Sequence, residues 1–208
     1  MASVLSIVQT KGGSGKTTTT MVLARALVAL GESVLVLDSD KQRSATEWAD
    51  DAGPDLGFEV MSVPTGRTLQ SAIDRYRASP EYSYLIVDTP PGSDDIVDKA
   101  SVNADLVLVP TGVSPLDMKR TQATLNWFED NADTPVAVVL TNVDKREKLL
   151  DLAQETLSSQ ARAALADTII PTRSATRRVG STVPRVTTKP FREWMELAEE
   201  VRTACREL

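Results

Sequence analysis

Short apolar runs alternate with longer stretches of helical periodicity along the whole chain. The apolar runs are continuous and rich in valine, isoleucine and leucine, which is typical of strands buried on both faces of a sheet. Pro110 is expected to close the fifth of these strands. The predicted strands cover residues 4–8, 33–37, 58–63, 84–87, 106–109, 136–140 and 168–170. The predicted helices cover a segment that ends near Gly31 and residues 42–50, 69–77, 94–104, 116–131, 146–165 and 191–208.

This alternation predicts a doubly wound α/β fold with a mostly parallel sheet and right-handed crossovers. The sequence contains no internal repeat, low-complexity stretch or linker, so residues 1–208 are expected to form a single domain. Ligands of such sheets bind beyond the carboxyl ends of the strands. Candidate chemistry is therefore expected where each predicted strand ends.

The segment between the first strand and the first helix is rich in glycine, and residues 11–18 are Lys-Gly-Gly-Ser-Gly-Lys-Thr-Thr. Glycine adopts backbone angles that other residues resist, and the N-terminus of a helix attracts anions. We expect a phosphate-binding loop in which Lys16 contacts the β- and γ-phosphates of a nucleotide and Thr17 binds Mg²⁺. A glycine-rich turn that binds nothing is the alternative, and the strand-turn-helix context disfavours it. The residues expected to bind nucleotide here are Lys11, Gly12, Gly13, Ser14, Gly15, Lys16, Thr17 and Thr18.

Aspartates follow two other apolar runs. Asp88 comes directly after residues 85–87, Leu-Ile-Val, which is the pattern of a Walker B strand whose carboxylate holds the shell of a bound Mg²⁺. Asp38 and Asp40 follow the strand at 33–37. Aspartate is also a favoured helix N-cap, so a capped turn at this point is a structural alternative that is compatible with a metal role.

Composition excludes several classes of chemistry. The 208 residues contain no histidine, which excludes histidine base catalysis and histidine metal ligation. The single cysteine, Cys205, excludes an internal disulfide and favours a reducing cytoplasmic compartment. No apolar run reaches the length of a transmembrane helix.

Charge is distributed unevenly. The net charge of −6 alone argues against a nucleic-acid partner, but residues 168–192 contain six basic and no acidic residues. The rest of the chain carries 17 basic and 29 acidic residues. A basic segment on an acidic body suggests phosphate contacts, with a solvated loop paired to the acidic body as the alternative. The residues expected to contact DNA are Arg173, Arg177, Arg178, Arg185 and Lys189.

The glycine-rich loop resembles the deviant Walker A loop of the ParA/MinD family. Thr10 stands where the common loop has glycine, and Lys11 follows it. In that family the first lysine crosses a nucleotide-sandwich dimer and contacts the phosphates of the partner subunit. The resemblance therefore implies catalytic roles for Lys11 in trans and for Lys16 in cis, with ATP and Mg²⁺ as cofactors and a homodimer on ATP binding.

Residues 38–42, Asp-Ser-Asp-Lys-Gln, are similar to the Asp-x-Asp-Pro-Gln element of the same family. The resemblance implies that Asp38 supports the metal and that Asp40 positions the attacking water. Lys41 replaces the family's proline, which loosens the expected turn. The resemblance also places Asn142 against the adenine and Pro171 among the cofactor-binding residues. Asn142 also fits a purely backbone role, because asparagine is common in turns.

Three functions share this fold and loop. A ParA-type partition ATPase would bind DNA non-specifically when ATP-bound and respond to a small centromere-binding partner that recognises the operator separately. A MinD-like membrane switch would need a basic amphipathic C-terminal helix, but residues 192–208 are acidic, so no membrane partner is expected. An ATP-dependent carboxylate ligase would need a further substrate site that the sequence does not reveal. The partition ATPase is preferred, with a cytoplasmic location and nucleoid association in the ATP-bound state.

Overall fold

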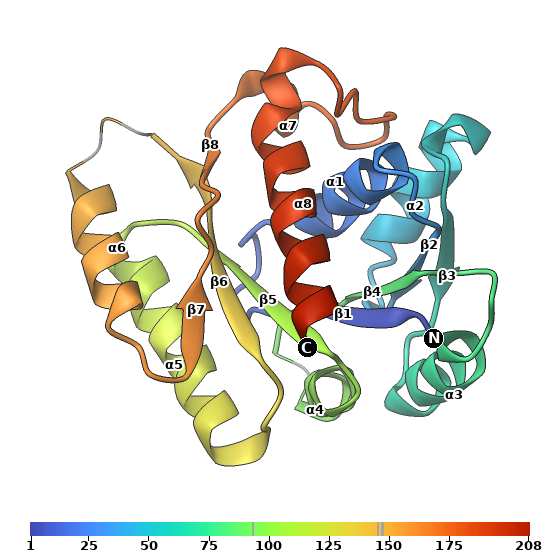
Figure 1. Ribbon diagram of the computed structural model, residues 1–208, viewed down its shortest axis with the longest axis horizontal. Coiled ribbons are helices and arrows are strands. Elements are labelled where there is room, and N and C mark those ends of the chain that lie inside the picture. Colours follow the sequence, from blue (N-terminus) through green and yellow to red (C-terminus); the bar gives the residue numbers. More distant parts are fainter. Residues whose placement is uncertain (93, 145, 147) are drawn as a thin grey trace.

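The computed structural model describes residues 1–92, 94–144, 146 and 148–208, and its centre is a parallel sheet between layers of helices (Figure 1). The strands lie in the order β3-β2-β4-β1-β5-β6-β7, and β8 pairs with β6 beside this row. Every pairing among the described strands is parallel. The predicted doubly wound α/β fold is therefore confirmed. The strands are β1 (Ser3–Ile7), β2 (Val34–Asp38), β3 (Glu59–Ser62), β4 (Tyr84–Asp88), β5 (Leu106–Thr111), β6 (Val136–Val143), β7 (Ala163–Leu165) and β8 (Ile170–Pro171).

Helices cover both faces of the sheet because alternate strand residues point to opposite faces. Val34 and Val36 of β2 pack with helices α1, α2 and α8, whereas Leu35 and Leu37 pack with α3 and α4. A third cluster packs α5 and α6 against β5 and β6. The helices are α1 (Lys16–Ala29), α2 (Ser44–Ala52), α3 (Gly66–Arg77), α4 (Asp94–Val102), α5 (Pro115–Asn131), α6 (Leu149–Ser158), α7 (Ser174–Arg177) and α8 (Arg192–Glu207), with 3₁₀ turns at Pro54–Leu56 and Lys189–Phe191. None of these described helices combines the length and apolarity needed to cross a membrane.

The register of the central strands brings the polar strand ends together. Ile7 of β1 lies beside Asp88 of β4, and Asp88 lies beside Asp38 of β2. The glycine-rich loop leaves β1 at this same edge and leads into α1. The carboxyl edge of the sheet therefore gathers the loop and both aspartates, as predicted from the strand pattern.

The helix predicted over residues 146–165 is wrong in its second half. The described helix α6 ends at Ser158, and Ala163–Leu165 forms β7 along β6 instead. The alanine-rich sequence favours a helix locally, but the open edge of β6 offers backbone partners, and pairing overrides the local preference. The sheet consequently has an additional short strand. Glu147, within the predicted range, lies outside the described residues.

Pro110 does not end the fifth strand, which continues to Thr111. β1 pairs only with residues 106–108 of β5, so its hydrogen bonding to β5 ends before the proline, and the missing N–H interrupts no pairing there. Pairing with β6 continues as far as Thr111 and Leu140. β6 itself runs on to Val143, beyond the predicted end at residue 140.

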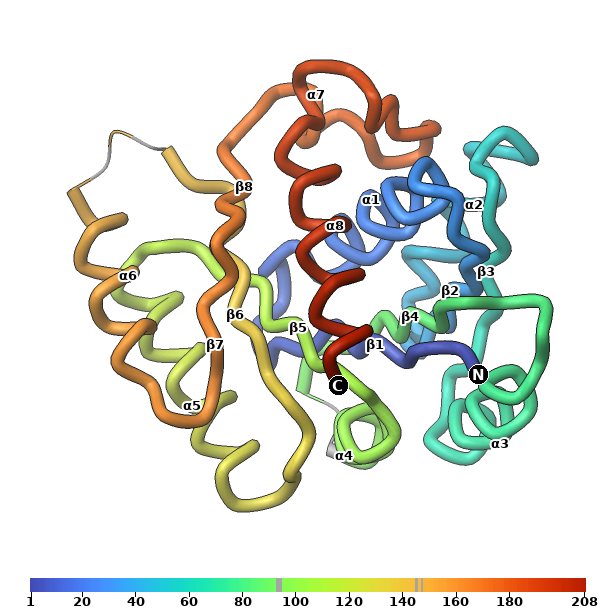
Figure 2. Tube along the Cα trace, viewed as in Figure 1, coloured from blue at the N-terminus to red at the C-terminus, as the bar shows by residue number. Residues whose placement is uncertain are grey.

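The C-terminal part of the chain crosses back over α1 and α2. Figure 2 traces it in orange and red from β8 through α7, over the ends of α1 and α2, and back as α8. Helix α8 packs against α1, and its Trp194, Leu197 and Val201 are buried there. The apolar side of this helix therefore belongs to the core.

Candidate functional site

The glycine-rich loop exposes the N-terminus of α1. Gly13 and Gly15 have φ values of +74° and +87°, in the left-handed region that glycine enters readily and other residues avoid. Gly15 is the N-cap residue of α1, and glycine has no side chain that could cap the helix. The first N–H groups of α1 and the positive end of its dipole therefore favour an anion at the loop.

Lys16 reaches back from the first turn of α1 across the loop. Its Nζ donates to the backbone carbonyls of Gln9 and Lys11 at 3.0 and 3.3 Å. Burial lowers the pKa of Lys16, while the charges of Asp88 and Asp40 oppose this effect. A cation held by neutral carbonyl groups gains a stronger, charge-assisted partner when a phosphate enters the loop.

Asp88 is buried at the end of β4 beneath α1. Its Oδ2 accepts a hydrogen bond from the Thr17 hydroxyl at 2.7 Å, and its Oδ1 accepts one from the Thr20 hydroxyl at 3.1 Å. Burial is the largest cause of a pKa of about 7 for Asp88; the charge of Asp38 also raises this pKa, whereas the two hydroxyl groups and the charge of Lys16 lower it. Lys16 therefore compensates the buried carboxylate only in part.

Asp38 and Asp40 have different surroundings. The buried Asp38 carboxylate accepts from the backbone N–H of Asp40 and, at 2.9 and 2.7 Å, from the N–H and hydroxyl of Thr46 in the first turn of α2. Asp38 thus caps α2 from the end of β2. Asp40 is partly exposed, accepts from the N–H of Gln42 at 2.9 Å, and contributes its charge to the surroundings of Lys16. The capped turn considered from the sequence is therefore present.

The oxygens of Thr17, Asp38 and Asp88 suit Mg²⁺. This ion typically takes one or two carboxylates from the protein and completes its shell with phosphate oxygens and water. In the described part of the chain, no group of three or more acidic, cysteine or histidine side chains could hold a metal by itself. The donor set therefore fits a Mg²⁺ ion that is bound together with a nucleotide.

Lys11 lies on the outer side of the loop and forms an ion pair with Asp117 of α5, with 2.7 Å between Nζ and Oδ1. Asp117 also accepts from the hydroxyl of Ser114, the N-cap residue of α5, at 2.6 Å. Burial would raise the pKa of Asp117, but the bonds from Lys11 and Ser114 outweigh it and lower that pKa. Asp117 was not among the site residues expected from the sequence, so it is a site residue that the sequence analysis missed.

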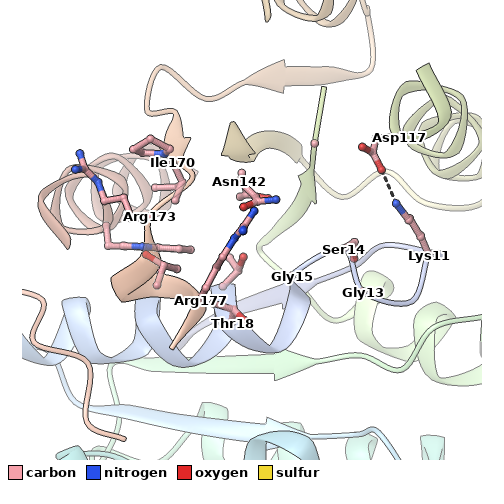
Figure 3. A pocket seen from close by; sticks show the side chains of 16 residues that line it. Lys11, Gly13, Ser14, Gly15, Thr18, Asp117, Asn142, Ile170, Arg173 and Arg177 are labelled. Carbon is pink, nitrogen blue, oxygen red and sulfur yellow. Dashed lines mark hydrogen bonds and ion pairs between the residues drawn. The ribbon is translucent and has the colours of Figure 1, made fainter. Parts of the chain in front are cut away.

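A cavity of about 310 Å³ extends from the loop towards β6, β8 and α7 (Figure 3). At the end away from the Lys11–Asp117 pair, the Arg177 side chain extends towards Asn142. Asn142 has φ of +56° at an irregularity in β6, and its Oδ1 accepts from Thr172, so it has a backbone role as well as a place in the wall. The predicted cofactor-binding residues that line the cavity are Lys11, Gly13, Ser14, Gly15, Thr18, Asn142 and Pro171, whereas Gly12, Lys16 and Thr17 do not.

The cavity wall contains buried polar atoms that have no hydrogen-bond partner among the described residues. Such atoms are rare in folded proteins, because each unsatisfied group costs about 1–3 kcal/mol. A ligand rich in hydroxyl and phosphate oxygens would satisfy them, so the wall fits a nucleotide. The unpartnered atoms in this wall are Ser14 Oγ, Thr19 Oγ1, Arg173 Nε, Thr176 Oγ1 and Trp194 Nε1.

The family model described as the CobQ/CobB/MinD/ParA nucleotide binding domain matches residues 5–182. The chain belongs to this family. Family membership implies nucleotide binding. Among curated relatives, the maintenance of carboxysome distribution protein A from Gloeobacter kilaueensis is 39% identical over 144 residues. The match covers 69% of this chain and 64% of that relative, so the chain spans less than two thirds of the relative's length.

Solved structures of ParA and MinD proteins share the fold of this family member. MinD from Pyrococcus horikoshii in complex with Mg-ADP has a TM-score of 0.74 at 20% identity, covering 97% of this chain and 96% of that chain. The pNOB8 ParA bound to nonspecific DNA has a TM-score of 0.69 at 17% identity, covering 100% and 99% of the two chains. The parallel sheet with a phosphate-binding loop after β1 is therefore the common ParA/MinD architecture.

In this ParA/MinD-family chain, the five basic residues predicted to contact DNA do not lie together. Arg173 and Arg177 line the cavity, and Arg173 forms an ion pair with the buried Glu193 at 2.6 Å. Arg178 and Arg185 are exposed and line a separate groove of about 370 Å³, and Lys189 is exposed in the same segment. The basic segment thus connects the cavity to the surface.

Proposed function

We propose that the chain is a ParA-type partition ATPase. In this proposal ATP and Mg²⁺ drive a nucleotide-sandwich homodimer, the dimer binds DNA without sequence preference, and a small centromere-binding partner stimulates the hydrolysis that releases it. The observation that carries the proposal is the path of residues 168–192, which begin in the cavity wall at Arg173 and continue to the exposed Arg178 and Arg185. A cationic surface continuous with the nucleotide cavity is suited to DNA binding that depends on nucleotide.

The residues around the cavity divide the chemistry of phosphoryl transfer. Mg²⁺, when bound, would neutralise charge on the β- and γ-phosphates. Lys16 exchanges its carbonyl partners for phosphate, and Thr17, Asp38 and Asp88 would hold the metal. Asp40, whose charge already acts on Lys16, orients the attacking water.

Dimerisation in this proposal depends on Lys11. To reach phosphates bound by a partner subunit, its Nζ must leave Asp117, which holds it at 2.7 Å. The pair is partly exposed, with 30% and 18% of the two side chains accessible, so its disruption costs only about 0.5–1 kcal/mol. Two phosphate contacts per dimer can offset that.

A related positioning function is the second candidate. The curated relative that is 39% identical is named for the distribution of carboxysomes, which favours a protein cargo as an alternative to DNA as cargo. The same ATP cycle serves either cargo. A membrane partner is not proposed, because Trp194, Leu197 and Val201 of α8 are already buried in the core. The proposed location is the cytoplasm, with nucleoid association in the ATP-bound state.

Binding to a random-sequence duplex tests the proposal. Fluorescence anisotropy would be measured without nucleotide, with ADP–Mg²⁺ and with ATP–Mg²⁺ over a salt series. Binding is expected only with ATP, with an affinity that falls steeply as salt rises, because phosphate contacts release counterions. Lys16→Ala should abolish both nucleotide binding and DNA binding.

Charge variants localise the DNA surface. Arg178→Ala with Arg185→Ala should weaken ATP-dependent DNA binding at least tenfold on every sequence and reduce the salt slope, while ATP binding stays unchanged. The matched control is Arg67→Ala with Lys99→Ala, which removes two exposed cations from α3 and α4 on the opposite face of the sheet. Equal DNA binding by both double variants would reject the groove as the contact surface, and no binding under any nucleotide would reject the partition proposal.

A further inference from the structure

Helix α2 connects the phosphate end of the site to the basic segment. Trp48 of α2 is buried, and its Nε1 donates to the backbone carbonyl of Thr182 at 2.7 Å. Thr182 belongs to the wall of the groove that Arg178 and Arg185 line. A single hydrogen bond thus joins α2 directly to the surface where DNA binding is proposed.

The start of the same helix is held by the nucleotide site. The N-cap residue of α2 is Arg43, which has φ of +55° and makes no capping bond with its side chain. The cap comes instead from Asp38, whose Oδ2 accepts from both the N–H and the hydroxyl of Thr46. Because Thr46 and Trp48 are two residues apart on one helix, a change at Asp38 and a shift of Trp48 are mechanically linked.

The basic segment around Thr182 is anchored by buried apolar side chains and by the bond from Trp48. Val179, Val186 and Phe191 are buried in the same core cluster as Trp48. The hydroxyl and N–H of Thr182 both donate to the carbonyl of Val179, which makes residues 179–182 a tight turn. Trp48 therefore holds the groove wall at Thr182.

We propose that Trp48 is a positioning residue that transmits the state of the phosphate site to the basic segment, through Asp38, Thr46 and Thr182. This inference rests on the proposed function, since it explains how nucleotide alters DNA binding. When a cation approaches the Asp38 carboxylate, that carboxylate becomes a poorer acceptor for Thr46. The first turn of α2 then shifts, and Trp48 carries the carbonyl of Thr182 and the wall of the groove with it.

Trp48→Phe tests the link because it keeps the aromatic packing and removes only the donor. The quantity of interest is the ratio of DNA affinity with ATP–Mg²⁺ to DNA affinity without nucleotide. We expect this ratio to fall at least fivefold, while the dissociation constant for ATP changes by less than twofold. Trp127→Phe is the matched control, because Trp127 lies on α5 and packs against the cluster between α5, α6, β5 and β6. The ratio for this variant should stay at the wild-type value.

A second variant separates coupling from loss of folding. Thr46→Val keeps the shape of the side chain and removes the hydroxyl bond to Asp38, so only the bond from the backbone N–H remains. This variant should reduce the same ratio, and Thr46→Val combined with Trp48→Phe should be no worse than the more severe single variant, because both act along one path. If Trp48→Phe is poorly folded by circular dichroism, Thr46→Val alone decides the outcome.

Hydrogen exchange provides a readout that does not need DNA. In the wild type, ATP–Mg²⁺ should change the exchange of backbone amides in residues 179–188, and Trp48→Phe should abolish that change. If the wild type binds no DNA, the partition proposal fails while this measurement still judges the coupling. The inference would be overturned if ATP–Mg²⁺ had its full effect on residues 179–188 in Trp48→Phe. If Trp48→Phe is misfolded, the same result in Thr46→Val would overturn it.

Discussion

Lys11 and Asp117 are 106 residues apart in the chain, and their side chains meet at 2.7 Å over the outer face of the phosphate-binding loop. The approach of Lys11 to Asp117 also depends on the absence of a side chain at Gly112. A Cβ atom at Gly112 would lie 2.7 Å from the Asp117 carboxylate, so any larger residue there would displace the acid. Lys11 is therefore restrained within its own subunit by a partner whose position the fold fixes.

Removing the charge of Asp117 should favour the ATP-bound dimer. Asp117→Asn keeps an acceptor for Ser114 but gives up the ion pair, which stabilises the monomer by about 0.5 kcal/mol per subunit. Two subunits together give about fivefold tighter association. Analytical ultracentrifugation with a non-hydrolysable ATP analogue and Mg²⁺ measures this, and Asp130→Asn, an exposed site near the end of α5, serves as the control. Weaker association would show that the pair helps to build the dimer.

Replacing Gln9 should destabilise the start of the glycine-rich loop, because the buried Gln9 side chain holds it. Its buried side chain accepts from the Thr10 N–H and the Thr124 hydroxyl, each at 3.0 Å, and donates to Thr121. Gln9→Leu removes these three bonds, but Thr121 and Thr124 keep their bonds to Thr111 and Arg120, so the free energy of unfolding should fall by about 1–2 kcal/mol. Urea unfolding measures the loss. Gln122→Leu, on the partly exposed side of α5, should change stability by less than about 0.5 kcal/mol.

Asp88 should give the nucleotide-free, metal-free protein a pH-dependent stability. Its pKa is about 7 in the folded chain against the usual 3.8, so between these values the folded state retains a proton that the unfolded state has released. The contribution of Asp88 to the free energy of unfolding therefore falls as pH rises from 4 to 7, by up to about 4 kcal/mol, and is constant above that window.

The measurement for Asp88 is the difference in stability between Asp88→Asn and the wild type at several pH values. That difference should move in favour of the variant from pH 4 to pH 7. Asp98→Asn, an exposed site on α4, should show no such trend. A flat difference for Asp88→Asn would mean that the carboxyl is ionised throughout.

Asp40→Asn should separate ATP binding from turnover. The amide still accepts from the N–H of Gln42, so the turn is kept, but the charge near Lys16 is lost. If Asp40 orients the attacking water, phosphate release should slow by roughly 100-fold while the ATP-bound dimer accumulates. Light scattering and a phosphate-release assay report the two quantities. Asp51→Asn at the exposed end of α2 is the control, and unchanged turnover in Asp40→Asn would assign the water to another residue.

Local sequence was sufficient to predict the parts of the site that depend on one strand end and its turn. The glycine loop, Lys16, Asp38 and Asp88 each follow an apolar run, and parallel strands bring such ends to one edge whatever the strand order. The pairings that close the site were not predictable in this way. Asp117 reaches Lys11 because α5 begins beside the loop, and that position follows from the order of β1 and β5 in the sheet.

The errors in secondary structure have the same origin. Ala163–Leu165 has a helical composition and becomes a strand because β6 has an open edge. Pro110 was predicted to end a strand, and it is tolerated within the strand because β1 pairs only with residues 106–108 of β5. Arg173 reads as a surface cation and is instead paired with Glu193, a residue buried by the packing of α8. In each case a neighbour distant in sequence overrides a local preference.

The strand order also bears on how this domain emerges from a ribosome. β1 is the earliest strand of the domain to be synthesised, yet it lies in the middle of the sheet between β4 and β5. One backbone edge of β1 stays unpaired until β4 ends at residue 88, and the other stays unpaired until residue 108 has been translated; α8, which packs on α1, comes later still. A nascent chain therefore carries an incompletely paired hydrophobic strand through half of its synthesis, which makes it a substrate for chaperones that shield such segments.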